Sequence, residues 1–204
     1  MKFLSPKLKS KLAELWSKLE PYKDVLIFVV ALFVSNGIWK LCIHGDEDNT
    51  AVTLFCWDIT PFFQYLSEMT ASAVYWVVSL FRDTVYQVDA ITLRFPTGGG
   101  SKIVWSCTPV KQSFIWLCIL LATIGDWKSK VWFIPFGWIC IFLFNILRIS
   151  AITMFMEFHP DWFEILHTYI FKYLFYGMLF GLWVWFVEGI RGVDASPSSE
   201  QSAA

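Results

Sequence analysis

The chain has 204 residues and lacks an excess of charge of either sign, with a formal net charge of −1. Because no basic field covers it, we expect no nucleic-acid partner.

The chain also lacks paired cysteines: five are present, an odd number, and none forms a C-x-x-C pair. This pattern disfavours a metal site and a disulfide framework. Two of the five, Cys118 and Cys140, lie inside apolar runs, and we expect them to be buried and unreactive.

The N-terminal segment lacks the apolar core and small-residue cleavage site of a signal peptide, so we expect none to be removed. Residues 1–23 are instead rich in lysine, with leucine and tryptophan at helical spacing. Two interpretations stay open: a basic amphipathic helix on the cytoplasmic leaflet, or a solvated tail. At the other end, the polar residues 191–204 are expected to be a disordered tail.

Large apolar residues are abundant. Hydrophobic residues make up 56% of the chain, with 12 Trp and 20 Phe, and the mean hydropathy is +0.54. A soluble domain is nearer to about 45–50% apolar, and it would have to hide all of these rings in one small core. A bilayer removes that requirement, because apolar side chains can face lipid. The composition therefore predicts a protein that crosses a membrane several times.

Four stretches have about the 20 apolar residues that cross the hydrocarbon: 24–43, 107–125, 131–156 and 162–187. The mixed stretch 55–82 is expected to be an interfacial or re-entrant helix. Alternating apolar residues around a run of three glycines predict a β-hairpin over about 85–105. The predicted fold class is an all-α polytopic membrane protein: a bundle of about four transmembrane helices, the interfacial or re-entrant helix and a small extracytoplasmic β-hairpin. Together they form a transmembrane domain over 24–190.

The placement of lysine and arginine predicts the orientation. The lysine-rich N-terminus, the loop containing Lys128 and Lys130, and Arg191 should all lie on the cytoplasmic side of the inner membrane. Four crossings satisfy this requirement. A fifth crossing, by residues 55–82, would put Lys128 and Lys130 outside, so we favour four, although the sequence alone does not exclude five.

Three polar residues occupy corresponding places in successive spans. Cys107 begins one span, Arg148 lies in the second half of the next, and His167 lies near the start of the last. Because successive spans run antiparallel, these three positions fall at the same membrane face. The charge argument makes that face extracytoplasmic.

These residue types together are typical of a cysteine nucleophile. A nearby cation favours the thiolate, His167 can move protons, and Arg148 can stabilise an oxyanion. Asn145, three residues before Arg148, shares its helix face and can orient it. Lys111, one turn beyond Cys107, can favour the thiolate or extend toward the interface.

Each of these residues also has a structural interpretation, because a lone cysteine, arginine or histidine in a span is often not catalytic. His159 is a rival for the histidine role. Glu157, Asp161 and Glu164 are expected to be solvated loop charges.

At these residues the chain resembles the exosortase/archaeosortase family of membrane-embedded cysteine transpeptidases, as a compact bacterial-type member. The resembling segments, in family order within about residues 60–187, are Ile103-Val-Trp-Ser-Cys107-Thr-Pro-Val-Lys111, Asn145-Ile-Leu-Arg148-Ile-Ser150 and Glu164-Ile-Leu-His167. The resemblance implies that Cys107 is the nucleophile, Arg148 the transition-state stabiliser and His167 the acid and base. The chain departs from the family at Thr108-Pro109, where a small residue and glycine are usual.

The resemblance also implies partners and a reaction. The substrates would be secreted proteins with a C-terminal sorting signal, made of a short motif, a transmembrane helix and a basic cluster. Cleavage through a thioester would be followed by transfer to a surface glycan or a membrane lipid, or to water in a simple protease. No metal or organic cofactor would be needed. The alternative is a non-catalytic membrane protein, such as an assembly factor or transporter subunit, in which Arg148 pairs with a buried acid.

Overall fold

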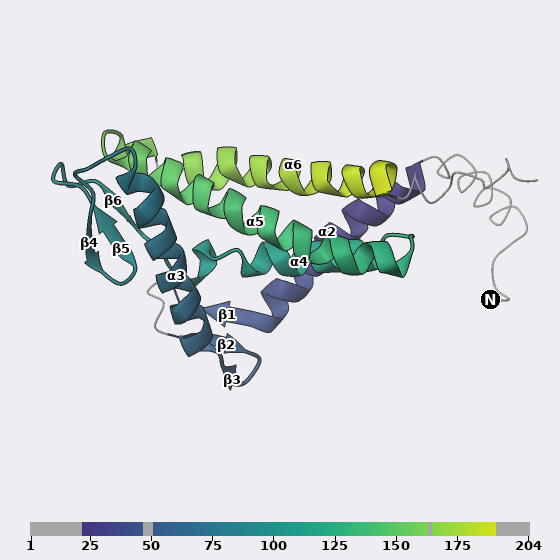
Figure 1. The fold of residues 1–204 in the computed structure, drawn as a ribbon. Coiled ribbons are helices and arrows are strands. Elements are labelled where there is room, and N and C mark those ends of the chain that lie inside the picture. The colour runs from purple at the N-terminus through teal and green to yellow at the C-terminus, as the bar shows by residue number, and fades with distance from the viewer. Residues whose placement is uncertain (1–21, 47–50, 163–164, 191–204) are drawn as a thin grey trace, which may run out of the picture.

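A computed structural model describes residues 22–46, 51–162 and 165–190. The predicted N-terminal segment, apart from its last two residues, and the tail with Arg191 lie outside this part. The chain is mostly helical, with two small antiparallel sheets (Figure 1). The α-helices are α2 (Lys23–Cys42), α3 (Thr60–Ser79), α4 (Val110–Ala122), α5 (Trp127–Met156) and α6 (Phe171–Val184).

Helices α2 and α5 are the two of the described part that are long and apolar enough to cross a membrane. α2 has 20 residues, and only 17% of its most apolar window is buried, so valine, leucine and phenylalanine cover its outer surface. α5 has 30 residues and begins at Asp126, whose carboxylate accepts a hydrogen bond from the backbone N–H of Lys128 at 3.1 Å. Lys128 and Lys130 therefore belong to the first turn of α5 and not to a loop.

The other two predicted spans are more broken than expected. α4 has 13 residues, about 20 Å at 1.5 Å per residue, which is shorter than the hydrocarbon core. The last span begins as the 3-10 turn η3 (Pro160–Trp162) and the π-helix η4 (Ile165–Ile170), and it ends in a second π-helix, η5 (Trp185–Ile190). The length of an apolar stretch did not reveal these changes of helix type.

Helix α3 accounts for most of the mixed stretch 55–82. It lies across one end of the other helices and runs from one sheet to the other (Figure 1). One face is buried, with Phe63, Ser67, Thr70, Ala71, Val74 and Val78. The opposite face exposes aromatic rings, among them Tyr65 at 66% and Trp76 at 64%. Exposed tyrosine and tryptophan are typical of a membrane interface, the position predicted for this stretch.

The strands form two three-stranded sheets, where the sequence predicted a single hairpin. The first contains β1 (Ile43–Gly45), β2 (Val52–Leu54) and β3 (Trp57–Asp58), which were not predicted. The second contains β4 (Tyr86–Asp89), β5 (Thr92–Arg94) and β6 (Gly100–Lys102). Its β5–β6 turn is the predicted glycine run, in which Gly98 has a φ of 96° that L side chains rarely adopt. β1–β3 were missed because strands of two or three residues are too short for alternation to show.

The second sheet is attached to the end of α5. The hydroxyls of Ser101 and Thr153 share a hydrogen bond of 2.7 Å. Arg82, just after α3, lies 3.3 Å from the carboxylate of Glu157, whose side chain is only 8% exposed. The expectation that Glu157 is solvated was therefore wrong, because this ion pair joins the end of α3 to the end of α5.

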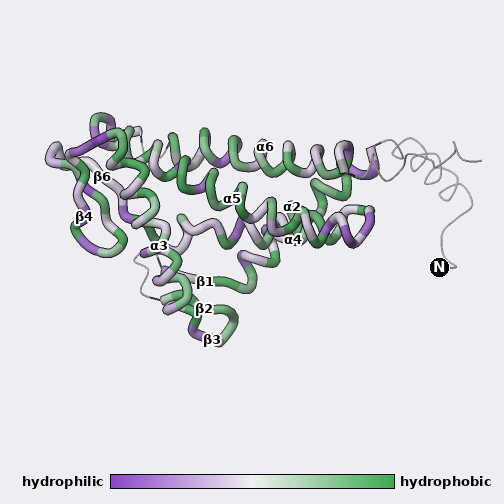
Figure 2. Tube along the Cα trace, in the orientation of Figure 1, coloured by the Kyte–Doolittle hydropathy of each residue, from purple (hydrophilic) through white to green (hydrophobic). Residues whose placement is uncertain are grey.

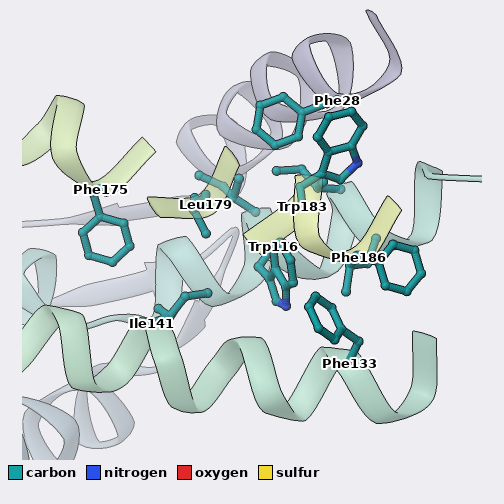
Figure 3. Close-up of a cluster of buried hydrophobic side chains, with 11 residues drawn as sticks. Phe28, Trp116, Phe133, Ile141, Phe175, Leu179, Trp183 and Phe186 are labelled. Atoms are coloured by element: carbon teal, nitrogen blue, oxygen red, sulfur yellow. The ribbon is translucent and has the colours of Figure 1, made fainter. Parts of the chain in front are cut away.

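The hydrophobic core lies between α2, α4, α5 and α6 (Figure 3). Trp116 is fully buried and its ring lies 5.9 Å from that of Phe133, while Phe28 of α2 lies 5.0 Å from Trp183. Hydrophobic residues cover the helices and much of the first sheet, and hydrophilic ones gather at the second sheet and at the α4–α5 loop (Figure 2). The two polar ends are thus separated by an apolar middle, as expected for a protein in a bilayer.

The α4–α5 connection is held by a buried lysine. Lys130 is 6% exposed, and its ammonium donates to the carbonyl oxygen of Thr123 at 2.5 Å. The indole of Trp183 donates to the Thr123 hydroxyl at 3.0 Å. A cation at the C-terminal end of a helix complements the helix dipole. Lys130 therefore has a structural role in addition to its contribution to the predicted orientation.

The contact between Gly137 and Trp116 yields a stability prediction. A Cβ at Gly137 would collide with the Trp116 indole, whereas one at Gly177 of α6 would meet nothing within 4 Å. We expect Gly137→Ala to destabilise the protein by about 1–3 kcal/mol through overpacking. The matched Gly177→Ala should leave stability unchanged or raise it by up to about 1 kcal/mol. Thermal unfolding in detergent measures both variants, and equal melting temperatures would contradict the packing described.

Candidate functional site

Cys107 lies in a tight turn that leads from the second sheet into α4. It is the last residue of the 3-10 turn η2 (Trp105–Cys107), and it is half-buried. Trp105 fixes the turn, because its indole donates to the carbonyl of Asp46 at 2.7 Å. The thiol thus comes from a rigid connection and not from a helix interior.

The backbone N–H groups around the thiol are already used. The N–H of Cys107 donates to the carbonyl of Val104 at 2.8 Å, and that of Thr108 donates to Trp105 at 3.1 Å. Pro109 has no N–H and forms the N-cap of α4. Residues 107–109 therefore offer no free N–H group to an oxyanion formed at this thiol.

Asn145 of α5 binds the turn directly. Its side-chain amide donates to the carbonyl oxygen of Cys107 at 2.9 Å, and the residue is 1% exposed. With the Ser101–Thr153 bond, residues 101–107 are attached to α5 at two points, eight helix residues apart. This segment therefore runs antiparallel along α5, and Arg148 lies between the two anchors. The amide positions the turn with Cys107, a role that sequence analysis did not assign to Asn145.

Arg148 is buried beside the thiol. It is 8% exposed, and it lies close enough to Cys107 for a charge on that thiol to act on the guanidinium. Its guanidinium carbon lies 6.0 Å from the centre of the Phe175 ring, and its Nε has no hydrogen-bond partner. In the described residues Arg148 makes no ion pair with a carboxylate. The structural alternative, a pair with a buried acid, therefore has no support here.

Arg148 also lines a cavity of about 400 Å³. The cavity lies between α2, η2, α4, α5 and α6, and its lining includes Ser106, Lys111 and Gln112 next to the cysteine turn. Two further lysines, Lys40 and Lys172, reach it from α2 and α6. Sequence analysis missed these two: Lys40 looks like an ordinary lysine at the end of a span, and Lys172 was given no role although it lies inside the predicted span 162–187.

The two candidate histidines, His167 and His159, are not both described to the same extent. The backbone of His167 belongs to η4, which continues directly into α6, but its side chain, like all of Glu164, lies outside the described residues. His159 is exposed and its ring lies 5.3 Å from that of Phe155. Within the described part, it does not line the Arg148 cavity. The site residues brought together are thus Cys107, Lys111, Asn145 and Arg148.

Two further cysteines, and the His, Cys, Asp and Glu side chains as a group, bear on whether the site could use another thiol or a metal ion. Cys118 and Cys140 are partly exposed, so the expectation of burial was wrong for both. Over the described ranges, no group of three or more His, Cys, Asp or Glu side chains is arranged to hold a metal ion. The chemistry available at this site is therefore that of a thiol, an amide and several cations.

A comparison with protein families identifies one match. The sequence profile described as transmembrane exosortase matches residues 50–190, which is more than half of the chain. This range contains Cys107, Asn145, Arg148 and His167. Neither the curated proteins nor the solved structures yield a match.

The pairing of Arg148 with Cys107 predicts how fast the thiol reacts. In a variant that keeps Cys107 as the single cysteine, we expect maleimide labelling at neutral pH to fall about tenfold or more with Arg148→Gln. A unit charge about 4 Å away is worth roughly 1 kcal/mol in water and about 4 kcal/mol in a protein-like medium. The matched control is Arg94→Gln, which removes an exposed cation from the second sheet. Equal rates in the two variants would contradict a specific role for Arg148.

Proposed function

The chain belongs to the transmembrane exosortase family, and from that premise we propose that Cys107 cleaves the sorting signal of secreted proteins. Family membership implies a transpeptidase for substrates with such a signal, and a membrane protein. The observation that carries the proposal is the closeness of a buried arginine, unpaired within the described residues, to a cysteine whose turn is fixed by Asn145.

The proposed reaction has two steps. The Cys107 sulfur attacks the scissile carbonyl carbon, the carbon–nitrogen bond breaks, and the leaving amine takes a proton from His167. The resulting thioester is then attacked by an acceptor amine, or by water, which returns a proton to His167 and frees the thiolate. His167 is assigned this role from its place in the family motif, and η4 puts its backbone one segment before Phe175 of α6.

Arg148 is proposed to stabilise the tetrahedral oxyanion. The N–H groups of Cys107 and Thr108 are occupied and Pro109 has none, so the backbone of this turn has little to offer. A buried guanidinium with an unpartnered Nε is a preorganised donor in apolar surroundings, where such a donor is worth most. The Thr108-Pro109 departure from the family pattern is in this way compensated by a side chain.

The transmembrane helix of the substrate is proposed to lie in an apolar groove beside Cys107. The groove has a volume of about 580 Å³ between α3, α4 and α5, and it begins at Pro109 and Val110. Its walls are apolar, with Met69, Phe142 and Leu143 among them. A helix with an apolar face fits such a groove, and its scissile bond would then lie near the thiol.

Transfer and simple hydrolysis remain alternatives within this proposal, because they differ only in the acceptor of the thioester. On the premise of the predicted orientation, the site faces the extracytoplasmic side of the cytoplasmic membrane. The lysine-rich residues 1–23 and the Lys128 end of α5 favour this placement.

The catalytic roles predict which substitutions stop processing. We expect Cys107→Ala to abolish cleavage in the native host, and Arg148→Gln to lower it by about 10²–10³-fold, the effect of losing an oxyanion donor. His167→Gln should have a comparable effect. Mass spectrometry of proteins with C-terminal sorting signals should detect uncleaved precursors in each variant.

Two controls accompany these variants. Cys118→Ala removes a partly exposed thiol elsewhere, and His159→Gln removes the rival histidine. Both should process substrates normally, and all variants should reach the membrane in equal amounts. Normal processing by Cys107→Ala would exclude the thioester mechanism and favour the non-catalytic alternative.

The groove predicts where a substrate can be cross-linked. A photoreactive p-benzoylphenylalanine in place of Leu143, in a Cys107→Ala background, should cross-link to the substrate helix because Leu143 lines the groove. Leu174 of α6 is the matched control, since it is similarly exposed, 52% against 54%, but lies outside the groove. Immunoblotting detects the adducts, and equal yields at the two positions would refute docking in this groove.

A further inference from the structure

We propose that the cavity lined by Arg148 binds the phosphate group of a membrane lipid. Four cations line it, each from a different helix: Lys40 from α2, Lys111 from α4, Arg148 from α5 and Lys172 from α6. Among the described residues, every charged side chain of this lining is therefore positive. The proposal rests on the membrane placement in the proposed function, but not on the identity of the nucleophile.

The four cations lack the partners that would normally offset their repulsion. Lys40 and Lys172 are close enough to Lys111 for their charges to act on it unfavourably. In the described part of the chain none of the four is paired with a carboxylate. Arg148 is more than nine-tenths buried, and its Nε, a hydrogen-bond donor, has no partner. Such a cluster is stabilised when an anion binds.

Phosphate matches the cavity better than a carboxylate does. Guanidinium and ammonium groups arranged around one space can together contact several oxygens of a phosphate, and basic pockets between transmembrane helices bind phosphate head groups. A lipid phosphodiester, like a carboxylate, carries one charge on two non-bridging oxygens, but its two ester oxygens are further acceptors that additional cations can contact. The number of cations therefore favours a phosphate-bearing ligand.

The walls and position of the cavity favour a lipid as the source of the phosphate. Trp39, Phe175 and Tyr176 provide apolar and aromatic surface next to the cations. Lys40 lies near the end of α2 and Lys111 at the start of α4, at the end of the bundle where both sheets lie, while Lys172 lies further in, just beyond η4. Lysine and aromatic residues at the ends of membrane helices lie at head-group depth. A phospholipid carries both a charged phosphate and apolar chains, so it fits both the cations and the aromatic walls of this cavity.

The experiment measures lipid retention in detergent by native mass spectrometry. Delipidated protein is titrated with phosphatidylglycerol, with dioleoylglycerol, which lacks phosphate, and with inorganic phosphate. We expect one tightly retained phosphatidylglycerol, no retained dioleoylglycerol, and weaker binding of inorganic phosphate. Removing two lysines, in Lys40→Gln/Lys172→Gln, should weaken phosphatidylglycerol binding about 25-fold, at about fivefold for each cation.

The matched control is Lys23→Gln/Lys128→Gln, which removes two positive charges at the opposite end of the bundle. It should bind phosphatidylglycerol as the wild type does, and so should Cys107→Ala, which separates this proposal from the catalytic one. In delipidated protein, Lys40→Gln/Lys172→Gln should also raise the melting temperature, because repulsion is relieved. This readout shows that the variant folds.

Three results would overturn the proposal. The first is equal loss of lipid in the cavity variant and in the control, which would indicate a non-specific charge effect. The second is inorganic phosphate binding as tightly as phosphatidylglycerol, which would remove the lipid from the assignment. The third is unchanged lipid binding together with weakened binding of a sorting-signal peptide, which would assign the cations to a substrate carboxylate.

Discussion

Burial of one cation, Arg148, constrains how the surrounding elements can pack. A charged side chain within a membrane span is costly, up to roughly 2.5–3.5 kcal/mol at the bilayer centre on insertion scales, so it persists where a polar space surrounds it. Here that space is a cavity to which four helices and the cysteine turn contribute. Aromatic rings and further cations line it in place of carboxylates. The helices therefore cannot close on Arg148, and the site remains accessible beside the thiol.

The second constraint is the double attachment of residues 101–107 to α5. Ser101 bonds to Thr153 and Cys107 bonds to Asn145, so a segment distant in sequence lies along the helix that carries Arg148. The sheets and α3 support this arrangement, because Arg82 and Glu157 join the end of α3 to the end of α5. The sheets and the cysteine turn thus position Cys107, while the apolar helices hold Arg148.

Two openings meet at the cysteine turn and differ in chemistry. The groove beginning at Pro109 is almost wholly apolar, whereas the cavity that includes Ser106 is lined by four cations. An apolar helix and an anionic head group have opposite requirements for burial, since one loses water favourably and the other needs charged partners. Cys107 lies between surfaces suited to each. A transferase that joins a membrane-bound protein to a second molecule needs two such surfaces.

Several features could be predicted from sequence because they depend on local pattern or composition. Apolar composition indicated a membrane protein, the glycine run located the β5–β6 turn, and the motifs around Cys107, Arg148 and His167, in family order, identified the family. Tertiary structure alone decided the rest. The bond from Asn145 to Cys107, the burial of Glu157 and the meeting of Lys40 and Lys172 with Arg148 join residues far apart in sequence. No periodicity within one segment encodes such contacts, because they arise only when helices pack.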